Sequence, residues 1–436
     1  MNAIDHNMIL SASGWRKIFA VSKNEQDKTP EIGEENTYLS CIAAYVFAEY
    51  IKTRFSKKTP TIVVGNDTRP TGTKIADAII KTLLKEKTVV KYIGITAAPE
   101  IMAYSKLFDG FIYISASHNP IGHNGIKFGL NDGGVLDAQE NAKLIEEFNL
   151  KCRDTNFLEK IEKKYLSVAG TELDWVYSES VSTKSEALAT YSAFSKNVIS
   201  SLAGLPAQES FFNKLKENIK KNPVGIVCDM NGSARTLSID KTFFAENNIN
   251  LYPFNDIPGQ IIHEIIPEPE NLIHCARRME ELQSQGRTDA ILGYMPDCDG
   301  DRGNIVYWND KTKKAEILKA QEVFSLSVLA ELAFSHWLNE NNKDYKPAVA
   351  VNCPTSMRIN EIADCFNAKV FRGEVGEANV VNTARLARKQ GYTVRILGEG
   401  SNGGTITFPS SVRDPINTIF AFIKLLLIRE DGLYSI

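Results

Sequence analysis

One short segment of the chain combines a nucleophile, a proton carrier and a cation. It reads FIYISASHNPIGHNGIKFG and runs from Phe111 to Gly129. The apolar run predicts a buried strand, and SASHNP predicts the turn that ends it. A serine at such a junction is exposed, and a nearby histidine or lysine can activate it or balance the charge of an attached phosphate. A serine of this turn, Ser115 or Ser117, with His118 and Lys127, is therefore a candidate catalytic group; the alternative is an Asn-Pro turn with incidental polar residues.

A second segment has the pattern of a cation site. It reads GYMPDCDGDRGNIV, from Gly293 to Val306, and places Asp297, Asp299 and Asp301 at alternate positions around a glycine turn. Three carboxylates aimed at one point suit a hard cation such as Mg²⁺, whereas without a cation they repel one another and their pKa values rise. An EF-hand loop is excluded because its glycine must stand sixth, and here it stands fourth. The alternative is a solvated acidic turn, but Arg302 and the preceding apolar run place the triad at a strand end.

A glycine-rich segment, VRILGEGSNGGTITF, runs from Val394 to Phe408. It matches G-x-G-x-x-G, but a dinucleotide-binding loop must open a helix, and TITF predicts a strand. The turn instead presents Glu399, Ser401 and Asn402, whose carboxylate, hydroxyl and amide suit the vicinal hydroxyls of a sugar. The alternative is a plain glycine-rich hairpin.

An arginine near the N-terminus adds a possible anion contact. Arg16 follows a Ser-Gly turn in SASGWRKIF, and its guanidinium could bind a phosphate. On its own, a surface arginine is the alternative interpretation. Together the four segments supply what phosphoryl transfer needs, which is positioning and neutralisation of charge.

One plan recurs three times along the chain. A β-branched run, a polar turn and a helix-period stretch begin at Thr61, Pro223 and Pro347. This strand–turn–helix order predicts α/β domains with parallel or mixed sheets. We expect three similar domains around a central cleft, namely residues 1–205 with a polar insert at about 150–205, residues 206–309 and residues 310–436. The stretch 311–338 is expected to be helical and to open the third domain.

The composition is that of an ordinary globular protein. The chain has 436 residues, of which 43% are hydrophobic and 24% charged, and its net charge of −3 argues against nucleic-acid binding. Seven scattered cysteines form no C-x-x-C pair, which fits a reducing compartment. We see no signal peptide and no membrane segment, since TIFAFIKLLLI is shorter than the roughly 20 residues that span a bilayer and reads as a core helix. A cytoplasmic location with no membrane partner is the expectation; the oligomeric state is open.

These segments resemble, in chain order, motifs of the α-D-phosphohexomutases, which include phosphoglucomutases, phosphomannomutases and phosphoglucosamine mutases. SGWR resembles the N-terminal phosphate-contacting segment, SASHNP with NGIKF the phosphoserine loop, DCDGDR the metal loop and GEGSNGG the sugar-specificity loop. VVGNDTR, PEPENL and VGEANVV match more weakly. The resemblance covers nearly the whole chain outside the insert.

The resemblance implies a mechanism for a hexose phosphate substrate. Phosphorylated Ser117, chosen over Ser115 from this resemblance, would donate its phosphoryl group to a hexose monophosphate and recover one from the other end of a 1,6-bisphosphate, which also serves as activator. Asp297, Asp299 and Asp301 would hold one Mg²⁺ together with an oxygen on Ser117. Arg302, Arg16 and Lys127 would stabilise the transferring group, and either His118 or Lys127 would move the proton. Glu399 and Ser401 would bind sugar hydroxyls, with Asn402 in the same turn, and the backbone of Val375 and Gly376 would line that face.

The sequence also departs from the family pattern. The family has a smaller fourth domain that binds the non-reacting phosphate, and we expect it to be missing here. Glu377 stands where many members have histidine or an aromatic residue, so the hexose cannot be inferred. Two other functions remain open, a non-catalytic sugar-phosphate-binding relative and an aspartate-based phosphatase.

Overall fold

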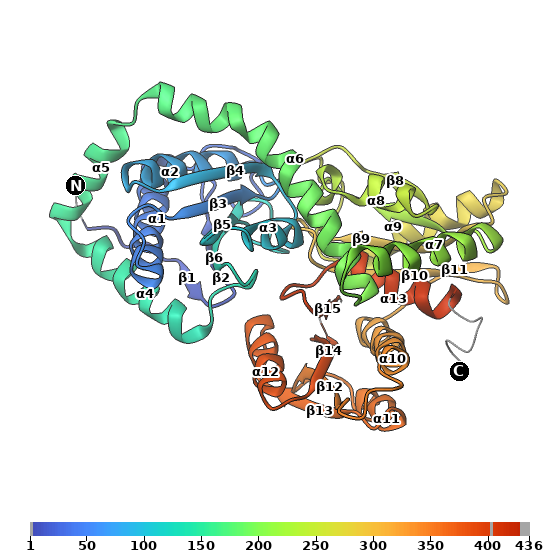
Figure 1. Ribbon diagram of the computed structural model, residues 1–436. Coiled ribbons are helices and arrows are strands. Elements are labelled where there is room, and N and C mark those ends of the chain that lie inside the picture. Colours follow the sequence, from blue (N-terminus) through green and yellow to red (C-terminus); the bar gives the residue numbers. More distant parts are fainter. Residues whose placement is uncertain (1–2, 402–403, 428–436) are drawn as a thin grey trace. The chain divides into compact units, whose positions relative to one another are not determined.

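The computed structural model describes residues 3–401 and 404–427. The chain forms two compact units, Met1–Tyr191 and Ser192–Ile436, whose boundary falls inside the long helix α6 (Gly170–Ser200; Figure 1). Each unit has its own sheet structure and its own hydrophobic core.

A six-stranded mixed sheet forms the centre of the first unit. Its strands, in spatial order, are β1 (Ile9–Ser11), β2 (Gly14–Ile18), β6 (His123–Leu130), β5 (Gly110–Ile114), β3 (Thr61–Asn66) and β4 (Val89–Ile95). β3 pairs in parallel with β4 and β5, whereas β5, β6, β2 and β1 pair antiparallel. Because β3 and β5 are parallel, the turns that follow both strands lie at the same sheet edge.

Helices cover this sheet. Besides α6 they are α1 (Gly33–Phe55), α2 (Gly72–Lys85), α3 (Ala98–Ser105), α4 (Ala138–Arg153) and α5 (Thr155–Leu166). Apolar residues of α1, α2, α4 and α5 share one core with the sheet. The polar segment at 150–205 is helical throughout most of its length. Lys184 of α6 attaches it to the end of β4, by donating to the carbonyl of Ile95 over 2.8 Å, and to α3, by donating to Glu100 over 2.5 Å.

The second unit contains a five-stranded sheet in its first part. In spatial order its strands are β11 (Lys314–Ile317), β10 (Gly303–Asn309), β9 (Ala290–Pro296), β7 (Gly225–Asp229) and β8 (Asn250–Phe254). The neighbouring helices are α7 (Leu205–Lys221), the short 3₁₀ helix Ala234–Leu237, α8 (Asp240–Glu246) and α9 (Pro269–Ser284). The expectation of helix from residue 311 was wrong at its start, because 314–317 form β11 and pair with β10. The helix α10 begins at Ala320 and ends at Leu338.

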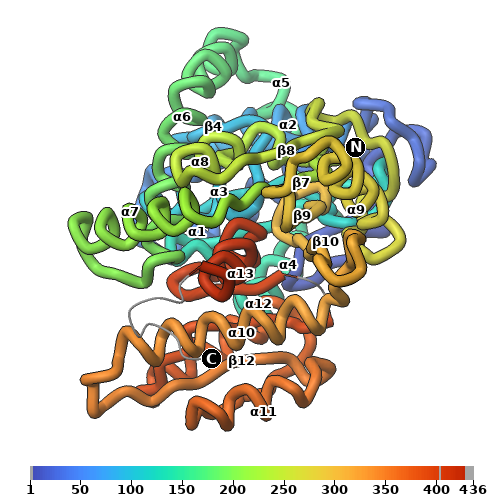
Figure 2. Tube along the Cα trace, turned by 90° about the vertical axis from the view of Figure 1, so that its right-hand side faces the viewer, coloured from blue at the N-terminus to red at the C-terminus, as the bar shows by residue number. Residues whose placement is uncertain are grey.

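A four-stranded sheet follows in the same unit. Its spatial order is β13 (Lys369–Gly373), β12 (Pro347–Asn352), β14 (Thr393–Gly398) and β15 (Thr405–Thr407). The remaining helices are α11 (Arg358–Cys365), α12 (Glu377–Lys389) and α13 (Pro415–Leu427). α10 and α11 pack on one face of this sheet and α12 packs on the other (Figure 1), while α13 lies beside α10 (Figure 2).

The three strand–turn–helix units predicted from the sequence are confirmed. They are β3 with α2, β7 with α8 after the 3₁₀ turn, and β12 with α11. The prediction of mixed α/β sheets is confirmed as well, since each of the three sheets holds parallel and antiparallel pairs. The polar turns of the candidate site follow β5, β9 and β14, which pair in parallel with β3, β7 and β12.

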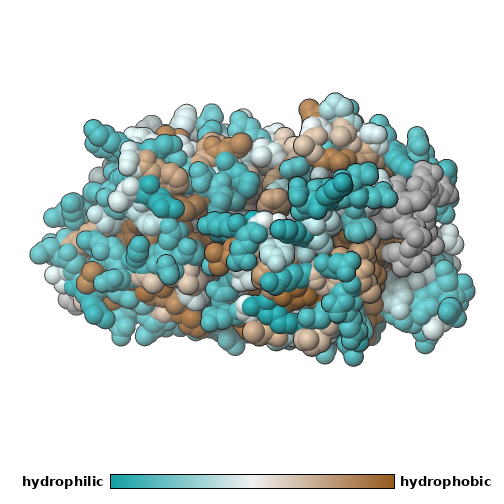
Figure 3. All heavy atoms as spheres, turned by 60° about the horizontal axis from the view of Figure 1, so that its bottom comes forward, coloured by the Kyte–Doolittle hydropathy of each residue, from teal (hydrophilic) through white to brown (hydrophobic). Residues whose placement is uncertain are grey.

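On the face seen in Figure 3, hydrophilic residues predominate and apolar residues occur in small groups. Within residues 3–401 and 404–427, none of the helices has both the length and the apolar character needed to cross a bilayer.

Candidate active site

The serine loop connects β5 to β6 in the first unit. Ser117 has φ of +53°, a region that non-glycine residues rarely adopt. The expectation of an exposed serine was wrong, because only 3% of Ser117 is exposed. Its backbone N–H donates to Oγ of Ser115 over 2.9 Å, and its own Oγ lies 3.5 Å from Nδ1 of His118. The two serines therefore have different positions, because Ser115 supports the turn through its side chain and Ser117 lies at its bend.

Two predicted cations lie on the sheet face beside this loop. Arg16 on β2 pairs with Gly125 on β6, and Lys127 on β6 pairs with Tyr113 on β5. Cross-strand partners share a sheet face, and residues two apart on one strand do too, so Arg16 and Lys127 project from the same face. Only 7% of Lys127 is exposed, and its Nζ lies 5.7 Å from the centre of the Tyr113 ring.

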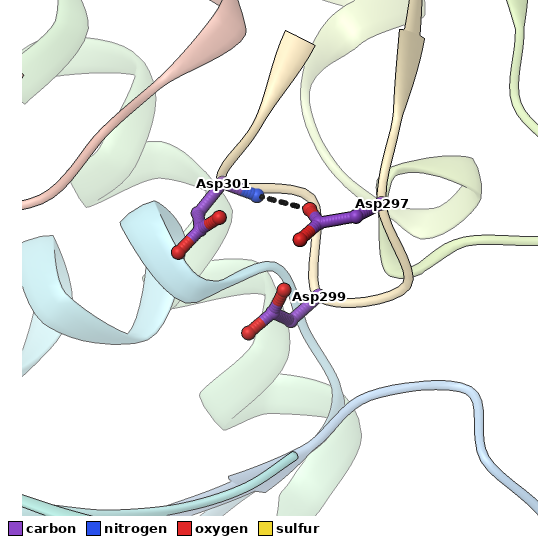
Figure 4. Close-up of side chains that lie close together, drawn as sticks. All are labelled: Asp297, Asp299 and Asp301. Carbon is purple, nitrogen blue, oxygen red and sulfur yellow. Dashed lines mark hydrogen bonds between the residues drawn. The ribbon is translucent and has the colours of Figure 1, made fainter. Parts of the chain in front are cut away.

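The acidic turn connects β9 to β10 in the second unit. Asp297, Asp299 and Asp301 are buried, and each offers a carboxylate oxygen within 4.8 Å of those of the other two. Figure 4 shows the three side chains projecting from one turn, where the Asp301 N–H donates to Oδ1 of Asp297 over 3.2 Å. Gly300, with φ of +69°, makes the sharp bend possible. The spacing predicted from the sequence thus brings the three carboxylates together.

The charge of this turn is unbalanced. Burial, and after it the carboxylates of Asp299 and Asp301, raise the pKa of Asp297 well above its usual range. Arg302 offsets this in part, with its Nε 3.8 Å from Oδ2 of Asp297. Hard oxygen donors, close spacing and mutual repulsion fit a divalent cation such as Mg²⁺. This is the single such group of His, Cys, Asp or Glu side chains in the part of the chain that the structure describes.

An arginine that sequence reasoning missed completes the turn. Arg413, which precedes α13, donates from Nη2 to Oδ2 of Asp301 over 2.9 Å, and its Nε lies 2.8 Å from Oε2 of Glu377. Burial alone would lower the pKa of Arg413, but Asp301 and then Glu377 raise it above its usual value. Arg413 is thus a permanent positive charge against the acidic turn. The only signal in the sequence was a charged pair, Arg413–Asp414, in front of a core helix.

A second buried arginine, Arg235, binds the backbone of the acidic turn. Arg235 donates from Nε to both carboxylate oxygens of Asp240, over 2.9 and 3.0 Å, and from Nη1 to the carbonyl of Gly300 over 3.3 Å. The same Nη1 lies 3.4 Å from Oδ1 of Asp414. In the segment that follows β15, Arg413 therefore contacts the acidic turn directly, and Asp414 is joined to it through Arg235.

The glycine-rich turn connects β14 to β15, so the strand predicted at TITF is confirmed, and the two strands pair antiparallel. Glu399 is 5% exposed, and its Oε1 accepts from Nδ2 of Asn352 over 2.8 Å and from the backbone N–H of Gly376 over 2.7 Å. The structure therefore brings the predicted residues Glu399 and Gly376 together. Val375, which precedes Gly376, and Ser401, two residues after Glu399, are both exposed. Asn402 lies outside the described residues.

Solved structures of phosphoglucomutases and related phosphohexomutases have a similar fold. A phosphoglucomutase/phosphomannomutase family protein from Burkholderia thailandensis has a TM-score of 0.64 at 16% identity, covering 98% of this chain and 80% of that one. Residues 11–152, which include the serine loop, match the family model of phosphoglucomutase/phosphomannomutase, alpha/beta/alpha domain I.

Sequence relatives agree with the fold. A phosphoglucosamine mutase of Nautilia profundicola is 28% identical over 359 residues, which is 81% of this chain and 69% of that protein. A phosphoglucomutase/phosphomannomutase of Thermococcus kodakarensis is 28% identical over 380 residues, 85% of this chain and 70% of that protein. The resemblance to phosphohexomutases is thereby confirmed, and the alignments span about seven tenths of these relatives.

Proposed function

We propose that this protein is a metal-dependent phosphohexomutase that interconverts hexose 1-phosphate and hexose 6-phosphate. The observation that carries the proposal is the buried triad of Asp297, Asp299 and Asp301, in a chain whose other unit carries the matching serine loop. The enzyme would be an isomerase whose net reaction moves a phosphoryl group between positions 1 and 6 of the hexose, with a hexose 1,6-bisphosphate as intermediate and activator.

Each step conserves the phosphoryl group. The bond between phosphorus and Oγ of phosphorylated Ser117 breaks as a new bond forms to a hydroxyl oxygen of the hexose monophosphate. The hydroxyl proton passes to His118 or Lys127. The bisphosphate then turns around, and its other phosphoryl group is transferred to Oγ of Ser117 as its bond to the sugar oxygen breaks. The proton returns to that oxygen, which leaves the isomeric monophosphate.

The residues divide the work by their chemistry. Asp297, Asp299 and Asp301 would hold Mg²⁺ together with a phosphate oxygen on Ser117, and the ion would neutralise charge on the transferring group. Arg302, Arg16 and Lys127 would add positive charge there. Glu399 and Ser401, with Asn402 and the backbone at Val375 and Gly376, would orient the sugar; the 2.7 Å contact between Glu399 and Gly376 supports a shared surface.

The aspartate-based phosphatase is less well supported. That chemistry usually places the aspartate pair just after the first strand of its domain, whereas here the triad follows β9 and the first strand is β7. A sugar-phosphate-binding protein without catalysis remains the second candidate, and turnover separates it from a mutase.

A coupled assay tests the proposal. Glucose 1-phosphate, mannose 1-phosphate and glucosamine 1-phosphate are each supplied with the corresponding 1,6-bisphosphate and Mg²⁺. The wild-type protein should convert at least one of them, and Ser117→Ala should lower that rate by at least about a hundredfold because the acceptor oxygen is lost. Ser115→Ala should retain more activity, since it removes a hydrogen bond of the loop and leaves the nucleophile. Conversion of none of the three by the wild-type protein would contradict the proposal.

A further inference from the structure

A single buried arginine joins the serine loop to the neighbouring turn of the first unit. Arg69 lies between β3 and α2, and its side chain has no exposed surface. Its Nη2 donates to the carbonyls of Ser117 over 2.6 Å and Asn119 over 2.7 Å. Its Nη1 donates to the carbonyls of Pro120 over 2.7 Å and His123 over 3.3 Å.

Every N–H of this guanidinium has an acceptor. The fifth donor, Nε, bonds to Oδ2 of Asp67 over 3.2 Å, and the backbone N–H of Arg69 bonds to Oδ1 of the same carboxylate over 2.9 Å. A guanidinium carries five donors in a fixed plane, so these contacts leave it one orientation. Asp67 is itself attached to the sheet, because its N–H donates to the carbonyl of Ile114 over 3.0 Å at the end of β5.

The loop needs such a partner for two physical reasons. Four carbonyl oxygens from one short loop point to a common centre, where they would repel one another without a donor between them, and the carbonyl of Ser117 is in addition buried. Ser117 also has φ of +53°, which costs energy and persists when surrounding contacts fix it. Arg69 supplies donors for the carbonyl of Ser117 itself and for three carbonyls that follow it.

We propose that Arg69 is a positioning residue that holds the serine loop in the conformation used for phosphoryl transfer, an inference that rests on the proposed mutase function. The bonds reach the backbone of the loop from the interior. Arg69 therefore acts on the rate of transfer to and from Ser117 through the loop, and substrate affinity depends on other residues. A displacement of about 1 Å at a reacting atom can lower a rate by a hundredfold.

The test compares Arg69→Met and Arg69→Lys with a matched control in the full-length protein. Asp109→Asn is the control, because Asp109 precedes β5 at the end opposite the loop. It is 6% exposed and accepts from Lys57 over 2.5 Å and from the N–H of Thr61 over 2.8 Å. The control thus weakens the charged contact of a buried carboxylate next to the same strand without touching the loop.

Three measurements are made on each variant. They are kcat and KM for the hexose phosphate that the wild-type protein converts, the rate at which glucose 1,6-bisphosphate phosphorylates Ser117, and hydrogen–deuterium exchange of amides 115–123. Arg69→Met should lower kcat and the phosphorylation rate by about a hundredfold, with KM changed less than about threefold. Arg69→Lys should fall between Arg69→Met and wild type. Amides 115–123 should exchange faster in Arg69→Met than in Asp109→Asn.

The outcomes separate this inference from the proposed function. If the wild-type protein is active and Arg69→Met keeps its kcat, or loses no more kcat than Asp109→Asn at equal thermal stability, the inference is wrong. If the wild-type protein neither turns over nor becomes phosphorylated, the proposed function fails. In that case hydrogen–deuterium exchange of amides 115–123 still tests whether Arg69 holds the loop. Unchanged protection of these amides in Arg69→Met would overturn that role, and a selective loss of protection would support it.

Discussion

Arg413 and Asp301 are 112 residues apart in sequence, yet Nη2 of the arginine donates to Oδ2 of the aspartate over 2.9 Å. The same guanidinium contacts Glu377, so one positive charge is shared between the acidic turn and the first turn of α12. A cation that binds the three aspartates must share Asp301 with this arginine. Arg413 therefore offsets part of the negative charge of the acidic turn and also opposes the binding of a second positive charge there.

Arg413→Met should raise the affinity for Mg²⁺, because removing a neighbouring positive charge lowers the Coulomb cost of bringing in the ion. We expect about tenfold tighter binding, or ~1.4 kcal/mol, at pH 8 in low salt. Calorimetric titration with Mg²⁺ measures it. Arg278→Met changes the net charge equally at an exposed position of the same unit and should leave the affinity unchanged. Weaker binding by Arg413→Met would mean that the arginine organises the turn for the ion.

Asp297→Asn should stabilise the cation-free protein at neutral pH. The folded state raises the pKa of Asp297, so between its unfolded and folded values the unfolded chain binds fewer protons. The wild-type protein therefore loses stability as the pH rises through that window, whereas Asp297→Asn does not. At pH 8 the gain should be on the order of 1 kcal/mol in chelator-treated protein, measured by urea unfolding.

The same variant should lose its response to magnesium. Binding to the folded state raises the thermal midpoint of the wild-type protein, and this rise should be absent in Asp297→Asn and present in Asp344→Asn, which alters an exposed carboxylate. A less stable cation-free Asp297→Asn at pH 8, or one that keeps the full magnesium response, would contradict the assignment of the turn.

Glu331→Gln should be strongly destabilising. Glu331 of α10 is buried and accepts from Nζ of Lys424 over 2.6 Å and from Nε of Arg395 over 2.8 Å. Removing the shared carboxylate leaves two buried cations without a counter-charge, which costs about 3–5 kcal/mol. Asp310→Asn, in an exposed pair with Lys313, should cost less than about 1 kcal/mol. Equal losses of unfolding free energy for the two variants in chemical denaturation would show that the contact of Glu331 with Lys424 and Arg395 is not stabilising.

His263 should stabilise the second unit in a pH-dependent way. Burial lowers its pKa, but the 2.9 Å contact of Nε2 with Asp229 and the charge of that carboxylate outweigh burial and raise it. The contribution is complete below the unfolded pKa and is lost as the pH rises through the folded pKa. His263→Gln should therefore cost on the order of 1 kcal/mol at acidic pH and less at alkaline pH. In an Asp229→Asn background this pH dependence should vanish; its persistence would assign it to another group.

The polar turns were predictable because their chemistry is local in sequence. Asp297, Asp299 and Asp301 alternate within five residues, and one glycine bend brings them together. The serine loop likewise follows from a short apolar run that ends at Ile114. The arginines were not predictable in this way. Arg413 and Arg69 act on backbone or carboxylates that only the folded sheets bring near them, and neither belongs to a periodic pattern.

The strand β11 shows a different limit. KAEI continues into the apolar periodicity of α10, so a window over the sequence favours one long helix. These residues form a strand because they pair with β10, where Ile317 lies opposite Val306. Tertiary pairing thus overrode local propensity at this position.

The central claim is that Ser117 carries the phosphoryl group, and intact-mass spectrometry tests it most directly. Protein incubated with glucose 1,6-bisphosphate and Mg²⁺ should gain the mass of one phosphoryl group. Peptide mapping should place it on Ser117, and hexose monophosphate should remove it. Ser117→Ala should show no gain, and Ser115→Ala should still show it. Conversion of hexose phosphate by protein that never carries this group, or a phosphoryl group that maps elsewhere, would contradict the account.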